Sequence, residues 1–388
     1  MKRCGVGALT VATLMLAACG GASDGTTSRP VPSTGTSPNA STTSVAESPP
    51  TAPVTSAPIG TPASTESGAT STSEPVVLAY GRPVDLGVLP GGPRSWAGDI
   101  NNAGQIAGMS YVGEFEHHAV WWPAVGADPI RLTDMVDLRH DQSSRAIEIN
   151  DSGQILLIAE PRAFVVEPST GSSTEIVAPF DEFDFDVADM NDHGQVVGTG
   201  VIERPPCDGC EADPITRAFV WDPETGETTI IGPLDGATSS GAQAINNQGH
   251  VAGWSDGRPF VWRPGDVAAR KLDPLPGHAW ATIYDLNDQG IAVGVSGRSA
   301  AMWHTDTGEV IDLGTLLPRT DHSWANSINQ SGEVALCSHD GVWIADPSSG
   351  TRREVPETTF GWSVSINDTG HAVGTSNGRA ALWNPTDV

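Results

Sequence analysis

Short apolar runs alternate with polar turns from residue 77 to the C-terminus. The clearest turn is "INDSGQ" at 149–154, and the run that follows it, "ILL" at 155–157, is apolar at consecutive positions. Neighbouring residues on a strand point to opposite faces, so this pattern predicts a strand that is buried on both faces, unlike a half-exposed antiparallel strand. In the turn itself, the Asn or Asp side chain caps the backbone and Gly takes the positive φ that closes a hairpin. Six near-copies precede similar runs: "INNAGQ" (100–105), "MNDHGQ" (190–195), "INNQGH" (245–250), "LNDQGI" (286–291), "INQSGE" (328–333) and "INDTGH" (366–371).

The seven turns recur with a period that is typical of β-propeller blades. Their first asparagines lie 38 to 55 residues apart, about 44 on average, and periods near 40 to 50 with strand-like content indicate propeller blades. Each repeat divides into four short strands, of which the third resembles "RAFVW" and the fourth "VIDLG". Repeats one and three reach the third strand late, through loop insertions near "EFEHH" and "ERPPCDGCEADP". The sequence therefore predicts an all-β, seven-bladed β-propeller of four-stranded antiparallel blades over residues 77–388.

The two ends of this region complement each other. It opens with "VDLGVL" at 84–89, a strand of the fourth type, and it stops after "RAALW" at 379–383, which is a strand of the third type. The seventh blade would therefore lack an outer strand, and an open edge exposes unpaired backbone groups. We expect 84–89 to pair with 379–383 and close the ring.

The N-terminus has the features of a processed leader and a linker. A basic start and an apolar run, which is too short to span a membrane, end in "LAAC" at 16–19. This resembles the lipobox of bacterial lipoproteins, and the resemblance implies a signal peptide at 1–18 and attachment of lipid, with acyl chains such as palmitate, to Cys19. An ordinary secretory signal is the alternative. Residues 19–76 are almost entirely Ser, Thr, Pro, Ala and Gly, a composition that predicts a disordered linker.

Several segments of the repeats resemble the HAF-repeat proteins of bacterial surfaces. These segments are "HAV" at 118–120, "RAF" at 162–164 and 217–219, "DLGVLPGG" at 85–92 and "DLGTL" at 312–316, together with the Asn turns. Arg replaces the His of the family's motif in several copies, and the sixth repeat is eroded. The resemblance covers about residues 80–388; it implies a secreted β-propeller and supplies no reaction.

Charge narrows the range of partners. The formal net charge is −27, and nearly all of it falls on the repeats, so a nucleic-acid partner is excluded on electrostatic grounds. Attraction to anionic lipid is equally disfavoured, so we expect membrane association through the lipid on Cys19, on the extracytoplasmic face of the cell membrane. Most of the negative charge is expected to keep the protein soluble through self-repulsion, which fits a monomer. The alternative role of this charge is to bind cations or basic partners.

Three kinds of residue recur in register and are candidate site residues. Acidic residues two positions before the turn Asn could place carboxylates near a propeller channel, as paired-carboxylate glycosidases require, but Ala or Ser replaces them in three blades, which favours a hairpin or salt-bridge role. The Trp residues at the end of the third strand are predicted to pack in the core and not to form a sugar site. The basic residues four positions before them are predicted to pair with carboxylates and not to bind an anionic ligand. The acids are Asp99, Glu148, Asp189 and Asp285; the tryptophans are Trp122, Trp221, Trp262, Trp303 and Trp383; the basic residues are His118, Arg162, Arg217, Arg258 and Arg379.

The cysteines predict one disulfide. Cys207 and Cys210 form "CDGC" within the insertion of repeat three, and in an oxidising compartment a local disulfide is expected there. Zinc would need further Cys or His partners, and a thioredoxin-like role would need a strand-to-helix context. Cys337, in the second strand of repeat six, is expected to be a buried free thiol.

No signature of a catalytic nucleophile, a metal site or a cofactor-binding loop occurs in the sequence. The favoured hypothesis is a lipid-anchored extracytoplasmic module that binds a protein or glycan of the cell envelope, with no chemistry and no cofactor of its own. The alternative is an envelope hydrolase, glycosidase-like, on a propeller scaffold. Carboxylates and His gathered at one channel mouth would favour the enzyme, whereas small and apolar residues there would favour binding.

Overall fold

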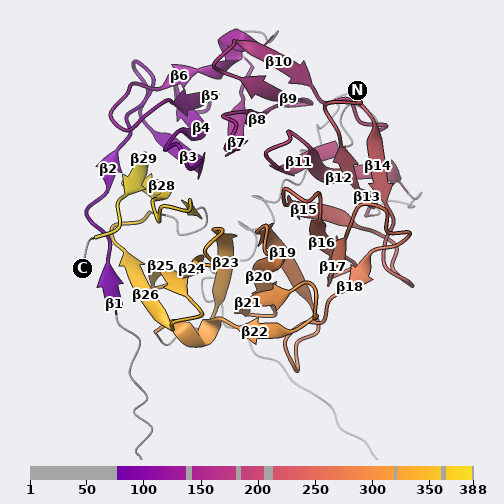
Figure 1. Cartoon of the computed structure of the whole chain (residues 1–388). Helices are drawn as coiled ribbons and strands as arrows, with labels where there is room; N and C mark the ends of the chain where they lie inside the picture. Colours follow the sequence, from indigo (N-terminus) through magenta and orange to yellow (C-terminus); the bar gives the residue numbers. More distant parts are fainter. Residues whose placement is uncertain are drawn as a thin grey trace, which may run out of the picture. The chain divides into compact units, whose positions relative to one another are not determined.

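The computed structural model describes residues 77–136, 142–180, 185–204, 213–318, 321–359 and 364–386. Within these ranges the chain forms seven sheets that stand as blades in a ring (Figure 1), with two short 3-10 turns, η1 (Leu132–Met135) and η2 (Gly314–Leu316), and no α-helix. The predicted seven-bladed β-propeller is therefore confirmed. The leader 1–18, the linker 19–76, Cys19, Cys207 and Cys210 lie outside the described residues.

Each blade contains four antiparallel strands, and the first of them lies nearest the axis (Figure 1). The first strands are β3 (Ser95–Ile100), β7 (Arg145–Ile149), β11 (Phe185–Met190), β15 (Gly241–Ile245), β19 (Ala281–Leu286), β23 (Ser323–Ile328) and β27 (Ser365–Ile366). The second strands are β4 (Ile106–Tyr111), β8 (Ile155–Ala159), β12 (Val196–Glu203), β16 (Val251–Ser255), β20 (Ile291–Ser296), β24 (Val334–Ser338) and β28 (Ala372–Ser376). The third strands are β5 (His117–Trp122), β9 (Arg162–Glu167), β13 (Ile215–Trp221), β17 (Arg258–Trp262), β21 (Ser299–His304), β25 (Gly341–Asp346) and β29 (Arg379–Trp383). The outer strands are β6 (Ile130–Arg131), β10 (Ser172–Glu175), β14 (Thr228–Ile231), β18 (Arg270–Lys271), β22 (Val310–Asp312), β26 (Thr351–Val355) and, for blade seven, β2 (Val84–Asp85).

The second strands are buried on both faces, as their consecutive apolar residues predicted. All five residues of β8 are buried, and the same holds for β24 and β28. Other second strands carry a glycine because the first strand runs close beside them. In β4, a Cβ on Gly108 would lie 2.1 Å from the main-chain oxygen of Trp96. Burial of both faces is what neighbouring blades in a ring provide.

The ring closes as predicted, because β2 pairs antiparallel with β29, with Val84 opposite Leu382 and Asp85 opposite Ala381. The N-terminal segment also makes a connection that the sequence did not suggest. Strand β1 (Val77–Ala79) adds a fifth strand to blade six and pairs parallel with β26. The segment 77–89 therefore joins blade six to blade seven before blade one begins.

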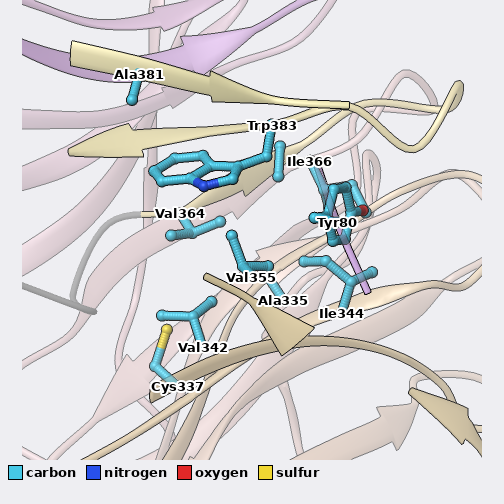
Figure 2. Close-up of a cluster of buried hydrophobic side chains, with 11 residues drawn as sticks. Tyr80, Ala335, Cys337, Val342, Ile344, Val355, Val364, Ile366, Ala381 and Trp383 are labelled. Atoms are coloured by element: carbon cyan, nitrogen blue, oxygen red, sulfur yellow. The ribbon is translucent and has the colours of Figure 1, made fainter. Parts of the chain in front are cut away.

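Tyr80 anchors this crossing segment in the core between blades six and seven. Figure 2 shows its ring beside Ile344, Val355 and Ile366, in a cluster of buried residues that also includes Trp383. The Tyr80 hydroxyl donates a 2.7 Å hydrogen bond to the main-chain oxygen of Gly370, in the turn of blade seven. A buried hydroxyl needs such a partner, so this bond holds the segment to the last blade.

The described residues contain no helix of sufficient length and apolarity to cross a bilayer.

Candidate functional site

The propeller has two unlike faces, which we call the Asn-turn face and the loop face. The Asn-turn face carries the seven Asn turns, between first and second strands, and the turns between third and fourth strands. Because the strands of a blade are antiparallel, the turns between second and third strands and the loops that lead to the next blade emerge at the opposite end, on the loop face.

A closed ring of hydrogen bonds joins the Asn turns. The side-chain amide nitrogen of each turn Asn donates to the main-chain oxygen of the turn Asn in the next blade, over 3.0 to 3.1 Å, and Asn367 returns to Asn101. The side-chain oxygen of each Asn accepts from the main-chain N–H four residues later. All seven side chains are buried. The first position of the turn therefore needs an amide, which both donates and accepts. Closing the hairpin is one of its two roles, and joining the next blade is the other.

A second ring of hydrogen bonds joins the residues that lie one position further along each turn. The main-chain N–H of each of these residues donates to the side-chain oxygen of its counterpart in the next blade, over 2.7 to 2.9 Å. The members are Asn102, Asp151, Asp192, Asn247, Asp288, Gln330 and Asp368. Since the amides of Asn102 and Asn247 each donate to two flanking carboxylates, the polar groups around the axis on this face are engaged with one another.

The structure brings the predicted acidic column together inside the ring. Each first strand except β27 has a shift in pairing register just before this position, and such bulges re-aim side chains. The carboxylate of Asp189 accepts from the N–H of Met190 and of Ile245, both at 2.7 Å. Asp285 bonds in the same way to Leu286 and to Ile328 of the next blade, both at 2.7 Å.

The remaining two acids form a pair. Asp99 accepts from the N–H of Ile149 in blade two, over 3.1 Å, and from the Ser365 hydroxyl of blade seven. Glu148 lies close to Asp99, and repulsion from Asp99 adds to the effect of burial in raising the pKa of Glu148. Asp189 and Asp285 satisfy main-chain N–H groups beside the bulges of their own strands, in keeping with the hairpin interpretation of the column. They also join neighbouring blades, and their partners are amides and hydroxyls.

Burial raises the pKa of all four acids. It brings the pKa of Asp189 to about 7 and that of Asp285 to about 6, and in both cases hydrogen bonds from main-chain amides oppose the rise. The pKa of Asp99 is raised by burial, and that of Glu148 is raised well above its ordinary value by burial and then by repulsion from Asp99. Although Glu148, Asp189 and Asp285 keep some exposed surface, protein surrounds them densely, as expected for side chains directed towards the axis of a ring.

The loop face carries a cavity of about 390 Å³ at the end of blade six. It lies among the start of β23, the turn between β24 and β25, and the segment that follows β26. Its lining residues are Trp324, Cys337, Ser338, His339, Asp340, Gly341, Glu354, Val355, Glu357 and Thr358. Trp324 packs edge-to-face against His339, at 5.7 Å between ring centroids, and against His322 at 6.2 Å. The lining thus combines one large aromatic side chain with mostly polar residues.

Exposed aromatic side chains also occur on the loop face. Phe115, in the turn after β4, is 80% exposed, and Trp280, just before β19, is 46% exposed. Val177 and Ile202 are exposed at this end of blades two and three. On the Asn-turn face the exposed large apolar residues are the aliphatic Val125 and Val267. Aromatic surface of this kind is typical of interaction sites.

The other two predicted columns have structural roles. The tryptophans pack in the core as expected: Trp122, Trp303 and Trp383 are fully buried, Trp221 nearly so, and Trp262 half-buried. The basic residues pair locally, for example Arg162 with Glu175 at 2.6 Å and Arg379 with Asp85 at 3.1 Å. His118 contacts Glu116 at 2.9 Å, while Arg217 and Arg258 bond main-chain oxygens.

Cys337 is buried and free among the described cysteines, as predicted, and burial raises its pKa to about 12. In the described ranges, no group of three or more His, Cys, Asp or Glu side chains is placed to hold a metal ion.

Comparison with known proteins identifies the fold alone. No family model matches the sequence, and no curated protein matches it. One similar solved structure is the extracellular domain of a one-component system from B. thetaiotaomicron, with a TM-score of 0.52 and 9% identity over 78% of this chain; the match spans 40% of that longer chain. A chain of the mitotic checkpoint complex has a TM-score of 0.51 and 12% identity, with 87% of this chain and 99% of that chain covered. An oligogalacturonate lyase from Vibrio parahaemolyticus has a TM-score of 0.47 and 11% identity, with 79% and 90% covered. The roles of these proteins differ, in keeping with the separation of fold from function.

Proposed function

We propose that the protein is a lipid-anchored, extracytoplasmic propeller that binds a protein or glycan of the cell envelope through its loop face, with no chemistry of its own. The observation that carries this proposal is the contrast between the two faces. Around the axis of the Asn-turn face, polar groups are engaged in two hydrogen-bonded rings. The loop face has a polar and aromatic cavity and exposed aromatic side chains.

The anchor rests on the sequence. Lipid on Cys19 would hold the chain at the membrane, and the linker that follows, treated as a flexible coil, would span on the order of 40 Å. That reach lets the propeller contact envelope components beyond the lipid surface. The extracellular domain among the similar structures supports an extracytoplasmic location by analogy of fold.

The alternative, an envelope hydrolase, has one supporting observation, which is the set of carboxyl groups with raised pKa near the axis. A general acid must reach the substrate, whereas Asp189 and Asp285 each accept two hydrogen bonds from main-chain amides. A glycosidase and esterase screen tests the alternative directly: turnover that the Glu148→Gln variant abolishes would favour the enzyme over the binding module.

The test of the binding function is affinity capture of envelope components by the full chain in detergent. Replacement of Phe115 and Trp280 by Ala should weaken capture, because it removes exposed aromatic surface from the loop face. The matched control is Val267→Ala, which removes exposed apolar surface from the Asn-turn face. Capture that survives the loop-face changes and is lost in the control would contradict the assignment of faces.

A further inference from the structure

The hairpin between β4 and β5 is longer than most of its counterparts on the loop face. In blades two, four, five, six and seven, two residues join the second strand to the third. In blade one the strand pairing continues beyond this level. Tyr111 lies opposite His117, and the N–H of Val112 donates to the Glu116 main-chain oxygen at 3.0 Å. Two further pairs of residues lengthen a hairpin by about 7 Å.

Arg94, in the loop that enters blade one, braces this hairpin. Its guanidinium lies over the Tyr111 ring, 3.9 Å from the ring centroid, and its Nη2 donates a 2.9 Å hydrogen bond to the Glu114 main-chain oxygen at the tip. The Tyr111 N–H donates in turn to the Arg94 main-chain oxygen over 2.9 Å. On the hairpin itself, the rings of Tyr111 and His117 lie 5.3 Å apart. These contacts hold the tip in place, so a partner would bind it at a small cost in ordering.

The braced tip presents an aromatic side chain to solvent. Phe115 is 80% exposed, the largest exposed fraction among the described Phe, Trp and Tyr side chains. A single exposed apolar residue is common on protein surfaces, but most such residues are not held on a braced extension of the fold. Folding gains little from a side chain that stays in water. Ordered aromatic side chains that can enter a pocket are typical anchors of protein interfaces.

The charges beside Phe115 indicate the kind of partner. Glu114 and Glu116 flank it in the sequence, and both are exposed. Glu116 contacts His118 at 2.9 Å, and burial lowers the pKa of this imidazole, which favours its neutral form and leaves the negative charge of Glu116 in place. Acidic groups around an apolar side chain complement a protein pocket that is rimmed by Lys or Arg. They oppose insertion into an anionic membrane surface.

We propose that the β4–β5 hairpin docks on an envelope protein, with Phe115 in an apolar pocket and with Glu114 and Glu116 facing Lys or Arg side chains at the rim of that pocket. Arg94 is a positioning residue, which holds the tip and does not enter the pocket. The inference rests on the proposed binding function. It specifies that the partner at this site is a protein and names the side chain that anchors it.

The test is photocrosslinking in intact cells that make the full chain. Phe115→p-benzoylphenylalanine places the reactive group at the tip, and Val267→p-benzoylphenylalanine, at an exposed position of the Asn-turn face, is the matched control. We expect one discrete, protease-sensitive adduct from position 115 and none from position 267. Mass spectrometry should map the crosslink to an apolar segment of the partner that has Lys or Arg beside it.

Two further changes, each combined with the photoreactive residue at position 115, test the geometry. Arg94→Ala removes the brace and should lower the yield of the adduct about threefold, because the tip must then be ordered on binding. Glu114→Arg should lower the yield about tenfold, because it opposes a basic rim. Glu309→Arg makes the same change of charge at an exposed position of the Asn-turn face and should leave the yield unchanged.

Four results would overturn the inference: no adduct from position 115, equal yields from the two positions, an adduct with lipid or polysaccharide in place of protein, or a yield that ignores both Arg94→Ala and Glu114→Arg. A different result separates this inference from the proposed function. If capture of an envelope component survives Phe115→Ser and is lost in Trp280→Ala, the loop face still binds, and the hairpin is not the contact.

Discussion

Substitution of one member of the Asn ring tests whether the ring stabilises the propeller. Asn246 is 3% exposed, and its side-chain nitrogen donates to the Asn287 main-chain oxygen at 3.1 Å. Asn246→Asp keeps the size and the acceptor oxygen but replaces the donor by a carboxylate oxygen that faces a carbonyl. A buried acceptor left without its donor costs about 1 to 3 kcal/mol, and burial of the new charge adds to this. We expect the free energy of unfolding to fall by about 3 kcal/mol at neutral pH.

The defect should depend on pH in a defined direction. Burial beside a carbonyl raises the folded-state pKa of the new carboxyl group above its unfolded value. The protonated group can again donate to the Asn287 oxygen. The penalty relative to the wild type is therefore largest above the folded pKa and shrinks as pH falls towards the unfolded pKa of about 4.

The assay is thermal unfolding of both proteins at pH 8 and near pH 4.5, compared as a difference in melting temperature at each pH. The control is Asn384→Asp, which makes the same change at an exposed position outside the rings and should be close to neutral. An unchanged melting temperature for Asn246→Asp at pH 8, or a deficit that does not shrink in acid, would refute the reasoning.

Three other predictions concern the ring closure, the buried acids and the anchor. A fragment that begins at Gly91 lacks β1, β2 and Tyr80 and should melt well below one that begins at Ser73; equal melting temperatures would exclude the closing role of this segment. Burial raises the pKa of the axial acids, to about 7 for Asp189 and about 6 for Asp285. Their protonated forms therefore stabilise the folded state in acid, and this stabilisation is lost as pH rises through these pKa values. The wild type should therefore melt higher at pH 5 than at pH 8, and Glu148→Gln should reduce that difference, as calorimetry can show. Cys19→Ala should abolish membrane retention in fractionation, and a processed variant that stays with membranes would contradict the lipid anchor.

The blades could be predicted because their signals are local. Turn chemistry and the period fix where strands begin and end, and the count of outer strands requires "VDLGVL" to complete blade seven, as β2 does. Strand β1 could not be found in this way. It pairs in parallel, so no tight turn links it to its partner, and three residues beside a linker carry little pattern.

The inter-blade ring was missed for a different reason. Hairpin chemistry explains an Asn in the turn and would equally accept Asp, so the turn looked fully explained. The overlooked signal is that Asn occupies the first position in all seven copies, while the next position varies among Asn, Asp and Gln. Only an amide can accept within its own turn and donate to the next blade, as Asn246 does.

The acidic column varies from blade to blade, which in the sequence argues against a catalytic site. The structure gives that variation a cause, since the Asp residues of blades one, three and five each reach a main-chain N–H of the following blade. The facing positions in blades two, four and six are then free to be Glu, Ala or Ser. A bulge in the first strand, which interrupts the alternation of faces, sets this arrangement, and no sequence period reveals it.

The two rings bear on where ligands can bind. Seven blades share the Asn-turn network, so a change in any turn disturbs contacts with both neighbouring blades, and a ligand on that face would have to displace hydrogen bonds worth about 1 kcal/mol each. At the other end, the described residues also make repeated inter-blade hydrogen bonds, which join the start of a first strand to the preceding blade, as the Ser95 N–H does to the Gly378 oxygen and the Ser240 N–H to the Thr216 oxygen. Both insertions of the sequence, near Phe115 in blade one and between β12 and β13 in blade three, fall at that end. The loop face is therefore the one on which the blades differ in loop length, and binding is expected on that face.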